Sequence, residues 1–341
     1  MDGRNIRNDC GLEAQHPLIV EPAFLNPQSE CHNATSRRGF LKKTLGFGGA
    51  LTLGGWSLES WAETAARAVN ITILHTNDVH SRLDPFPASD PRNGGKGGIV
   101  NRARLISRIR SEEKNVLLFD AGDAFQGTPY FNFFGGEPEI RAMSLLGYDA
   151  MTMGNHDFDG GAELFARQIK AHANFPVLVA NYDVTDSPLR DVVKPYQVFK
   201  KDGVKIGVFG LGIAPDGLIP LNLFAGTRYL DPVAKANELA AFLRNEEKCS
   251  LVVCLSHLGY SMQGGEISDL KLAPQTRGID LIIGGHTHTF LKEPTTVKNL
   301  DGKPMLVNQV GFGGIHLGRL DFTFDRVTKQ VFAQSQTTAV G

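Results

Sequence analysis

The chain has 341 residues, of which 42% are hydrophobic and 21% charged, and these fractions exclude a wholly disordered protein. Its 35 basic and 36 acidic residues give a net charge of −1 and form no basic stripe, which argues against a nucleic-acid scaffold. No uncharged apolar run reaches the roughly 18 residues of a conventional membrane span, so we expect none in the mature protein.

The first segment of the chain has the pattern of an export leader. Residues 36–42 read Ser-Arg-Arg-Gly-Phe-Leu-Lys, and the uncharged stretch 44–58 that follows is rich in Gly, Leu and Ala. This stretch is too short to cross a membrane but is typical of the apolar segment of a signal peptide. The Arg37-Arg38 pair resembles the twin-arginine export signal.

We therefore expect residues 1–68 to form a leader that the twin-arginine translocase recognises. Ala66-Arg67-Ala68 has the small-x-small form of a cleavage site, and Ser60-Trp61-Ala62 is the competing choice. This interpretation predicts a periplasmic or secreted protein.

From Val69 onward, apolar runs typical of strands alternate with helical stretches. The patterns predict strands at 69–75, 115–119, 150–153, 175–180, 204–211, 251–255, 279–283 and 305–310. They predict helices at 98–110, 137–146, 162–172, 233–245 and 269–274. Segments 317–324 and 330–336 predict a closing antiparallel pair. Such alternation favours an α/β core with helices on the outside.

Five polar motifs occur in the mature chain, and most directly follow a predicted strand. They are Thr-Asn-Asp-Val-His at 76–80, Asp-Ala-Gly-Asp at 120–123, Gly-Asn-His-Asp-Phe-Asp at 154–159, Ser-His-Leu-Gly at 256–259 and Gly-Gly-His-Thr-His at 284–288. Functional sites of α/β sheets gather beyond the carboxyl ends of the strands. We therefore expect the five motifs to converge on one site.

The residue types in these motifs suit two adjacent divalent metal ions. Carboxylate, amide and imidazole ligands without a thiolate point to Mn, Zn or Fe. Asp78 and His80 lie two residues apart, as do His286 and His288, so each pair can face one way in an extended segment. Asp123 could bridge both ions, because a carboxylate has two oxygens to offer.

The order of the motifs, Asp-x-His, Gly-Asp, Gly-Asn-His-Asp, His and Gly-His-x-His, resembles the calcineurin-like metallophosphoesterases. The sequences at 73–81 and 154–159 are similar to the N-terminal catalytic domain of the 5′-nucleotidase branch, and the match spans about 70–325. The resemblance implies that residues 69–341 form one catalytic domain of α/β class. Its expected fold is a four-layer αββα sandwich with mixed β-sheets.

The resemblance also implies a role for each polar residue. The first metal would be held by Asp78, His80, Asp123 and His288, and the second by Asp123, Asn155, His257 and His286. His156 would sit over the phosphoryl group and, with Asn155, bind substrate. Asp159 would orient His156, and Asp157 is the weaker candidate for that role.

The implied function is hydrolysis of phosphate monoesters by a metal-activated hydroxide, with 5′-nucleotides or related nucleotide or sugar phosphates as substrates. One alternative is a thiosulfate-ester hydrolase of sulfur oxidation, because His288 resembles the residue found in those enzymes. Another is a non-catalytic metal- or phosphate-binding module. Phe134 and Phe312 could line a substrate pocket above the metals, or they could pack against the core.

Overall fold

The computed structural model describes residues 68–328 and 331–341. The predicted leader therefore lies outside the described residues, except for Ala68, which begins the first strand. Among the described helices, none is both long enough and apolar enough to cross a membrane.

The first sheet has seven strands in the order β15-β14-β1-β2-β3-β4-β6. Its strands are β1 (Ala68–Thr76), β2 (Val116–Asp120), β3 (Ala150–Met151), β4 (Val177–Leu178), β6 (Val193–Lys194), β14 (His316–Asp325) and β15 (Val331–Ala339). The five from β1 to β6 run parallel, and β14 and β15 complete the sheet as an antiparallel pair, as the sequence predicts.

The second sheet has six strands in the order β12-β13-β11-β10-β8-β7. Its strands are β7 (Tyr196–Lys201), β8 (Val204–Leu211), β10 (Leu251–Ser256), β11 (Leu281–Gly284), β12 (Thr295–Lys298) and β13 (Pro304–Asn308). The four central strands are parallel, and the edge strands β7 and β12 are antiparallel to their neighbours. A short separate pair joins β5 (Tyr182–Asp183) to β9 (Arg228–Tyr229).

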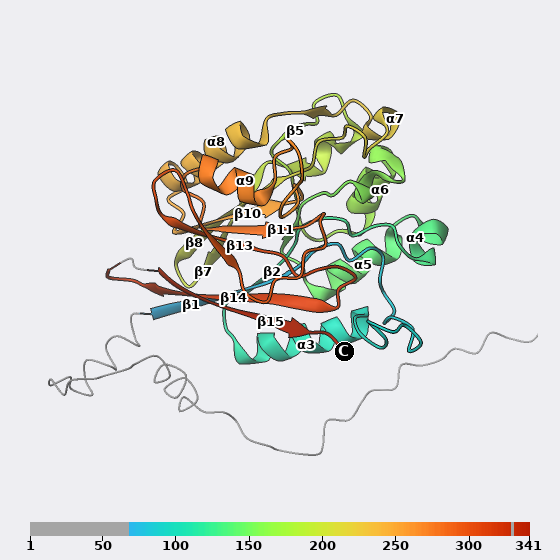
Figure 1. Cartoon of the computed structure of the whole chain (residues 1–341), viewed down its shortest axis with the longest axis horizontal. Helices are drawn as coiled ribbons and strands as arrows, with labels where there is room; N and C mark the ends of the chain where they lie inside the picture. Colours follow the sequence, from blue (N-terminus) through green and yellow to red (C-terminus); the bar gives the residue numbers. More distant parts are fainter. Residues whose placement is uncertain (1–67, 329–330) are drawn as a thin grey trace, which may run out of the picture. The chain divides into compact units, whose positions relative to one another are not determined.

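Helices cover the outer face of each sheet, which makes four layers (Figure 1). The helices are α3 (Ile99–Glu112), α4 (Pro129–Phe134), α5 (Glu137–Leu146), α6 (Gly161–His172), α7 (Leu221–Phe224), α8 (Pro232–Asn245) and α9 (Asp269–Leu272), with 3-10 turns η1 (His156–Phe158), η2 (Pro188–Asp191) and η3 (Ala273–Gln275). The α/β sandwich with mixed sheets is confirmed.

Three apolar cores hold these layers together. The middle core lies between the sheets and contains Ile71 and Ile73 of β1 together with Val208 of β8 and Val253 of β10. The other two cores lie beneath the helices of each sheet. Because alternate residues of a strand point to opposite faces, each central strand supplies two of these cores.

The predicted elements differ from the structure mainly at the edges. The sequence patterns predict neither β7 nor β12, since the residues of these strands are mostly half exposed and include several Lys, Thr and Gln that dilute an apolar pattern. The helix predicted at 269–274 ends at Leu272, and a 3-10 turn containing Pro274 follows it.

His75 lies buried in the sandwich. Its side chain is fully buried on β1, and Asn308 Nδ2 of β13 donates a hydrogen bond of 2.8 Å to its Nε2 atom. Burial lowers the pKa of His75 to about 3, because the charged imidazolium would lose its hydration. The folded protein therefore holds this histidine neutral.

This burial predicts a loss of stability in mild acid. Between pH 6.5 and 3 the unfolded chain binds a proton at His75 that the folded chain does not, so the free energy of unfolding falls as the pH drops through that window. From pH 7 to pH 5 we expect the wild type to lose about 2 kcal/mol more than His75→Gln, measured by urea unfolding. An equal loss in both proteins would contradict the assignment.

Candidate metal centre

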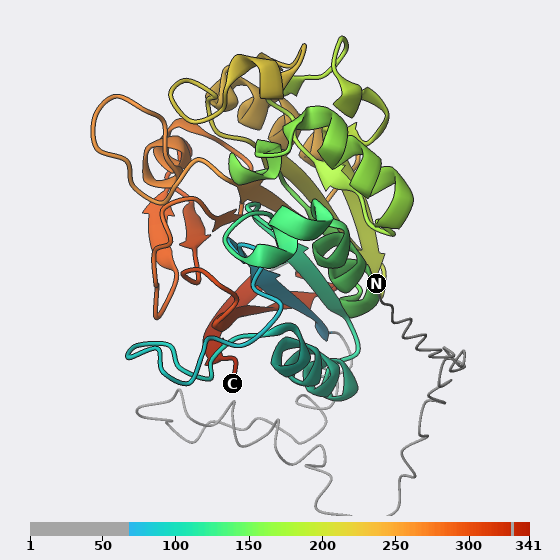
Figure 2. The ribbon, with the colours of Figure 1, turned by 90° about the vertical axis from the view of Figure 1, so that its right-hand side faces the viewer.

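The five polar motifs meet at one end of the sandwich. They follow β1, β2 and β3 of the first sheet and β10 and β11 of the second, all at the carboxyl ends of parallel strands. The same end carries α4 and α6, as Figure 1 shows, and Figure 2 looks onto it. The expected convergence of residues far apart in sequence is therefore present.

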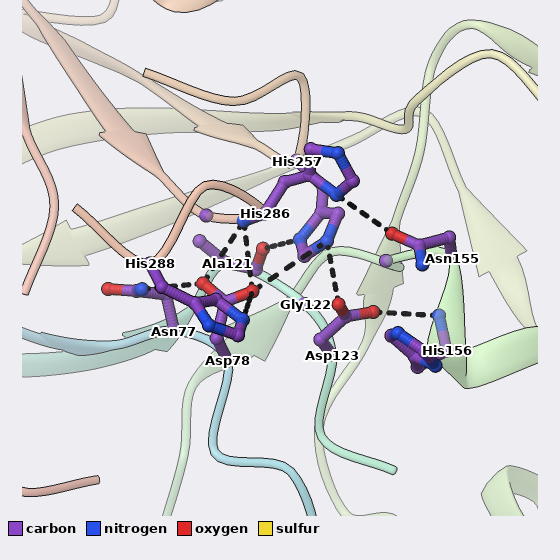
Figure 3. A network of polar contacts seen from close by, with 12 residues as sticks. Asn77, Asp78, Ala121, Gly122, Asp123, Asn155, His156, His257, His286 and His288 are labelled. Atoms are coloured by element: carbon purple, nitrogen blue, oxygen red, sulfur yellow. Dashed lines mark hydrogen bonds and ion pairs between the residues drawn. The ribbon is translucent and has the colours of Figure 1, made fainter. Parts of the chain in front are cut away.

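The motif side chains form two groups of possible metal ligands. One group joins Asp78 and His80 to His288, and the other joins Asp123 to His257 and His286. Within each group the ligand atoms lie within 4.8 Å of one another. Figure 3 shows Asp78 and His288 of the first group beside Asp123, His257 and His286 of the second.

Asp123 lies between the two groups. Its Oδ2 atom is 3.1 Å from His257 Nε2 in its own group and 3.8 Å from His80 Nε2 in the other. Asp78 is also close to both, with Oδ1 3.4 Å from His288 Nε2 and 3.9 Å from His257 Nε2. A carboxylate placed in this way can bind two cations at once.

The donor atoms fit divalent cations. His257 Nε2 is buried and has no hydrogen-bond partner among the described residues, although a carboxylate oxygen lies near it. His80 Nε2 and His288 Nε2 face each other at 2.9 Å, which is a natural arrangement for two lone pairs directed at one cation. Buried carboxylates and imidazoles without thiolates are the ligand set of Mn, Zn or Fe.

Backbone carbonyls fix two of the imidazole rings. His257 Nδ1 donates to Ala121 O at 2.6 Å, and His80 Nδ1 donates to Gln126 O at 3.1 Å. With Nδ1 engaged, the Nε2 atom of each ring is left free to bind a metal ion. Both carbonyls belong to the loop after β2, so that loop also orients candidate ligands that follow other strands.

The loop after β3 supplies Asn155 and His156. Asn155 Oδ1 lies 2.9 Å from His286 Nδ1, which places the amide beside the second group. His156 donates its backbone N–H to Asp123 Oδ1 at 2.8 Å, and its Nδ1 atom is 2.9 Å from Asp159 Oδ2. Burial lowers the pKa of His156, but Asp159 and Asp123 raise it, and the net shift is upward.

Five candidate ligands have left-handed backbone conformations. Their φ angles are 50° at Asp78, 51° at His80, 57° at Asp123, 71° at His286 and 51° at His288. Residues other than glycine rarely adopt positive φ, and such strain gathers at functional sites, where the surrounding contacts enforce it.

Three residues outside the predicted ligand set hold these loops in place. Asn77 donates to Gly311 O at 2.6 Å and accepts from Val310 N at 3.0 Å. Gln309 Oε1 accepts from Thr289 N and from Thr287 Oγ1, which shapes the loop that carries His286 and His288.

Asp157 is the third of these residues. Its buried carboxylate accepts from the backbone N–H groups of Gly154, Asp123, Ala124 and Phe125, at 2.8 to 3.2 Å. It therefore ties the loop after β2 to the loop after β3. The contact with the His156 imidazole comes instead from Asp159.

The aromatic residues near the site divide into two kinds. Phe125 and Phe131 are buried in the core, whereas Phe133 and Phe134 at the end of α4 are 79% and 55% exposed. Phe312 stacks on His288, with ring centroids 5.2 Å apart and an interplanar angle of 19°. Phe134 is thus available to a ligand, and Phe312 contacts a candidate metal ligand.

Replacing Asp157 by Asn tests whether this side chain holds the loops after β2 and β3 together. The amide turns one acceptor into a donor that faces backbone N–H groups, so we expect Asp157→Asn to lower the free energy of unfolding by about 1–3 kcal/mol. The matched variant Asp159→Asn changes a half-exposed group and should leave stability within about 0.5 kcal/mol. Urea unfolding of both variants measures the difference. Equal stabilities of Asp157→Asn and Asp159→Asn would rule out this role of Asp157.

Known proteins share both the sequence and the fold. Residues 71–290 match the calcineurin-like phosphoesterase family. A snake venom 5′-nucleotidase from Crotalus adamanteus is 33% identical over 284 residues, which cover 76% of this chain and 46% of the relative. The chain thus spans about half the length of the curated relative it matches.

Solved structures agree with this assignment. A 5′-nucleotidase precursor from Thermus thermophilus superposes with a TM-score of 0.71 at 34% identity, covering 80% of this chain and 55% of that one. A sulfate thiohydrolase from Thermus thermophilus shares the fold with a TM-score of 0.66 at 20% identity, over 79% of this chain and 56% of that one. The chain therefore belongs to the calcineurin-like phosphoesterase family of metal-dependent phosphoester hydrolases, with 5′-nucleotidases among its relatives.

Proposed function

We propose that this protein is a dinuclear-metal phosphomonoesterase that acts on 5′-nucleotides or related nucleotide and sugar phosphates. The observation that carries the proposal is the pair of ligand groups on either side of Asp123, with His156 directly beside them. The relatives named 5′-nucleotidase support the choice of substrate class.

The proposed ligands divide as the two groups do. Asp78, His80 and His288 hold one divalent cation, Asn155, His257 and His286 hold the other, and Asp123 binds both. When bound, such a pair of ions polarises the phosphoryl oxygens and lowers the pKa of the attacking water. The protein then needs no covalent bond to the phosphoryl group, because positioning and electrostatics supply most of the catalysis.

His156 is the proposed catalytic residue beside the metals. Asp159 holds its Nδ1 atom, which leaves Nε2 to hydrogen-bond the phosphoryl group or to give a proton to the leaving oxygen. The upward shift of its pKa favours the protonated, donating form near neutral pH. Asn155 is proposed to contact the phosphoryl group as well as the metal.

Two aromatic side chains are proposed to contact the organic part of the substrate. Phe134 is 55% exposed at the end of α4. This helix begins two residues after Gly127, and Gly127 packs against His80. An exposed ring can stack on a planar leaving group. Phe312 covers His288 on one face and is itself only partly buried.

Two variants separate metal loss from loss of catalysis. Asp123→Ala should abolish phosphate release and strongly reduce bound metal, because it removes a ligand from both positions. His156→Ala should keep both metals and slow turnover by on the order of 10²–10³. Phosphate release from AMP, a sugar phosphate and an aryl phosphate, with elemental analysis of each protein, measures both effects. If His156→Ala lost its metal, the role given to His156 would be wrong.

The same substrates test the reaction class. The phosphomonoesterase proposal requires release from at least one of them by the metal-loaded wild type. Inactivity on all of them, together with cleavage of a protein-bound thiosulfate ester, would favour the thiosulfate-ester hydrolase instead. Phe134→Ala should raise KM for AMP more than for a sugar phosphate, which carries no base on which the ring could stack.

We also propose that the protein is exported by the twin-arginine route to the periplasm or beyond. The Arg37-Arg38 pair and the apolar stretch after it, which lie outside the described residues, support this proposal. We expect the double substitution of Arg37 and Arg38 by Lys to retain the precursor in the cytoplasm, detected by cell fractionation. Replacing Lys42 and Lys43 by Arg is the matched control and should leave export intact.

A further inference from the structure

Thr76 and Asp120 are the first residues of two of the polar motifs, and the proposed reaction gives neither of them a role. Thr76 is the last residue of β1, Asp120 is the last residue of β2, and both are fully buried. Thr76 Oγ1 donates a hydrogen bond of 2.5 Å to Asp120 Oδ2. Side chains therefore join the two strand ends that lead into the loops with Asp78 and Asp123.

Tyr148 extends this pair into a chain of three hydrogen-bonded groups. It lies in the connection from α5 to β3, is 4% exposed, and its hydroxyl oxygen is 2.7 Å from Thr76 Oγ1. Burial raises the pKa of Tyr148 to about 12, so the hydroxyl keeps its proton. Because Thr76 gives its only hydroxyl proton to Asp120, Tyr148 is the donor to Thr76. Both hydroxyl protons are thus directed along the chain toward the Asp120 carboxylate.

The other carboxylate oxygen of Asp120 holds the start of the loop after β2. Oδ1 accepts the backbone N–H of Gly122 at 2.9 Å, which closes an Asx-turn. Gly122 has a φ angle of 91°, and a Cβ atom there would lie 2.6 Å from Gly154 N and 2.7 Å from His257 Nδ1. The backbone at Gly122 therefore packs directly against two other loops of the site.

The segment that this turn fixes, Ala121 and Gly122, contacts one candidate ligand of each group. Ala121 O accepts from His257 Nδ1 at 2.6 Å (Figure 3), and Gly122 O accepts from the backbone N–H of Asp78 at 2.9 Å. Ala121 N donates to Thr76 O at 3.0 Å, which keeps the segment against the end of β1. Asp78 belongs to the first ligand group and His257 to the second. A shift of this segment would therefore move members of both groups.

We propose that Asp120 is a positioning residue for both metal positions, and that Thr76 and Tyr148 hold its carboxylate in place. Acting through the two residues that follow it, Asp120 sets the separation between Asp78 and His257. Breaking the chain should therefore loosen both ligand groups together. The consequence for metal binding rests on the proposed function, whereas the placement of His257 does not.

Thr76→Val tests the chain with little change of shape, because valine is also β-branched and lacks only the hydroxyl. Thr72→Val is the matched control. Thr72 lies on the same strand, is 2% exposed, and donates to Asp321 Oδ1 at 2.6 Å. Each variant therefore loses one hydrogen bond from a buried threonine of β1 to an aspartate, and only the Thr76 bond belongs to the proposed chain.

The Nδ1 proton of His257 reports on positioning in the metal-free protein. Because His257 is fully buried, we expect this proton to give an NMR signal that exchanges slowly with water in the full-length wild type after chelation. Thr76→Val should speed the exchange about tenfold or more, since Ala121 O is no longer held in place, and Thr72→Val should leave it unchanged. Equal exchange in the wild type and Thr76→Val, or no protected signal in the wild type, would overturn the inference.

Calorimetric titration with Mn²⁺ tests the consequence for the metals. Loss of a residue that orients metal ligands typically weakens binding about 10–100-fold, and we expect such a loss at both Mn²⁺ sites of Thr76→Val. Thr72→Val should bind both ions as the wild type does. A loss at one site only, or at neither, would contradict the positioning of both groups. A wild type that binds fewer than two Mn²⁺ ions would instead contradict the proposed function, and the NMR measurement would still decide the role of Asp120.

Tyr148→Phe carries the NMR test if Thr76→Val does not fold. This variant removes only the outer hydroxyl and leaves the contact between Thr76 and Asp120, so the His257 proton should exchange faster than in the wild type. Added to Thr76→Val, it should produce no further change, since the chain is already broken at Thr76. Unchanged exchange in Tyr148→Phe, or additive effects of the two substitutions, would overturn the chain.

Discussion

The Asp123 carboxylate is the contact on which the rest of the site depends. It stands within 4 Å of imidazole nitrogens from both ligand groups, and it also receives the backbone N–H of His156. Moving this one side chain would therefore disturb both groups of candidate ligands and the proposed catalytic histidine together. The loop that carries it is fastened by Asp157, and its carbonyls orient His80 and His257.

Strand order places that carboxylate at the centre. β2 lies next to β1 and β3 in the first sheet, so the loop after it is flanked by the loops with Asp78 and Asn155. The second sheet brings β10 and β11 to the same end, with His257 and His286 beyond them. Five of the candidate ligands have left-handed backbone conformations, and Asn77 and Gln309 hydrogen-bond to the loops around them.

Sequence patterns predict the candidate ligands better than they predict the residues that hold the ligand loops in place. The motifs are local, and their place after β-branched apolar runs is enough to expect convergence of Asp78, Asp123 and His257. The residues that hold them leave no local signal. Gln309 accepts a hydrogen bond from Thr287, more than twenty residues earlier in the chain. Arg102 lies on the buried face of α3, where an arginine interrupts the apolar pattern, and donates to the carbonyl of Arg82. Such roles arise only from the three-dimensional packing.

Both ligand groups draw on both sheets of the sandwich. Asp78 and His80 follow the first sheet while His288 follows the second, and Asp123 and His257 divide in the same way. The two cysteines of the described residues are free, so no disulfide joins the layers there. Each bound cation would act as a removable cross-link between the sheets. The resistance of the protein to unfolding would then rise with the concentration of free metal in its surroundings, since an ion that binds only the folded state favours that state.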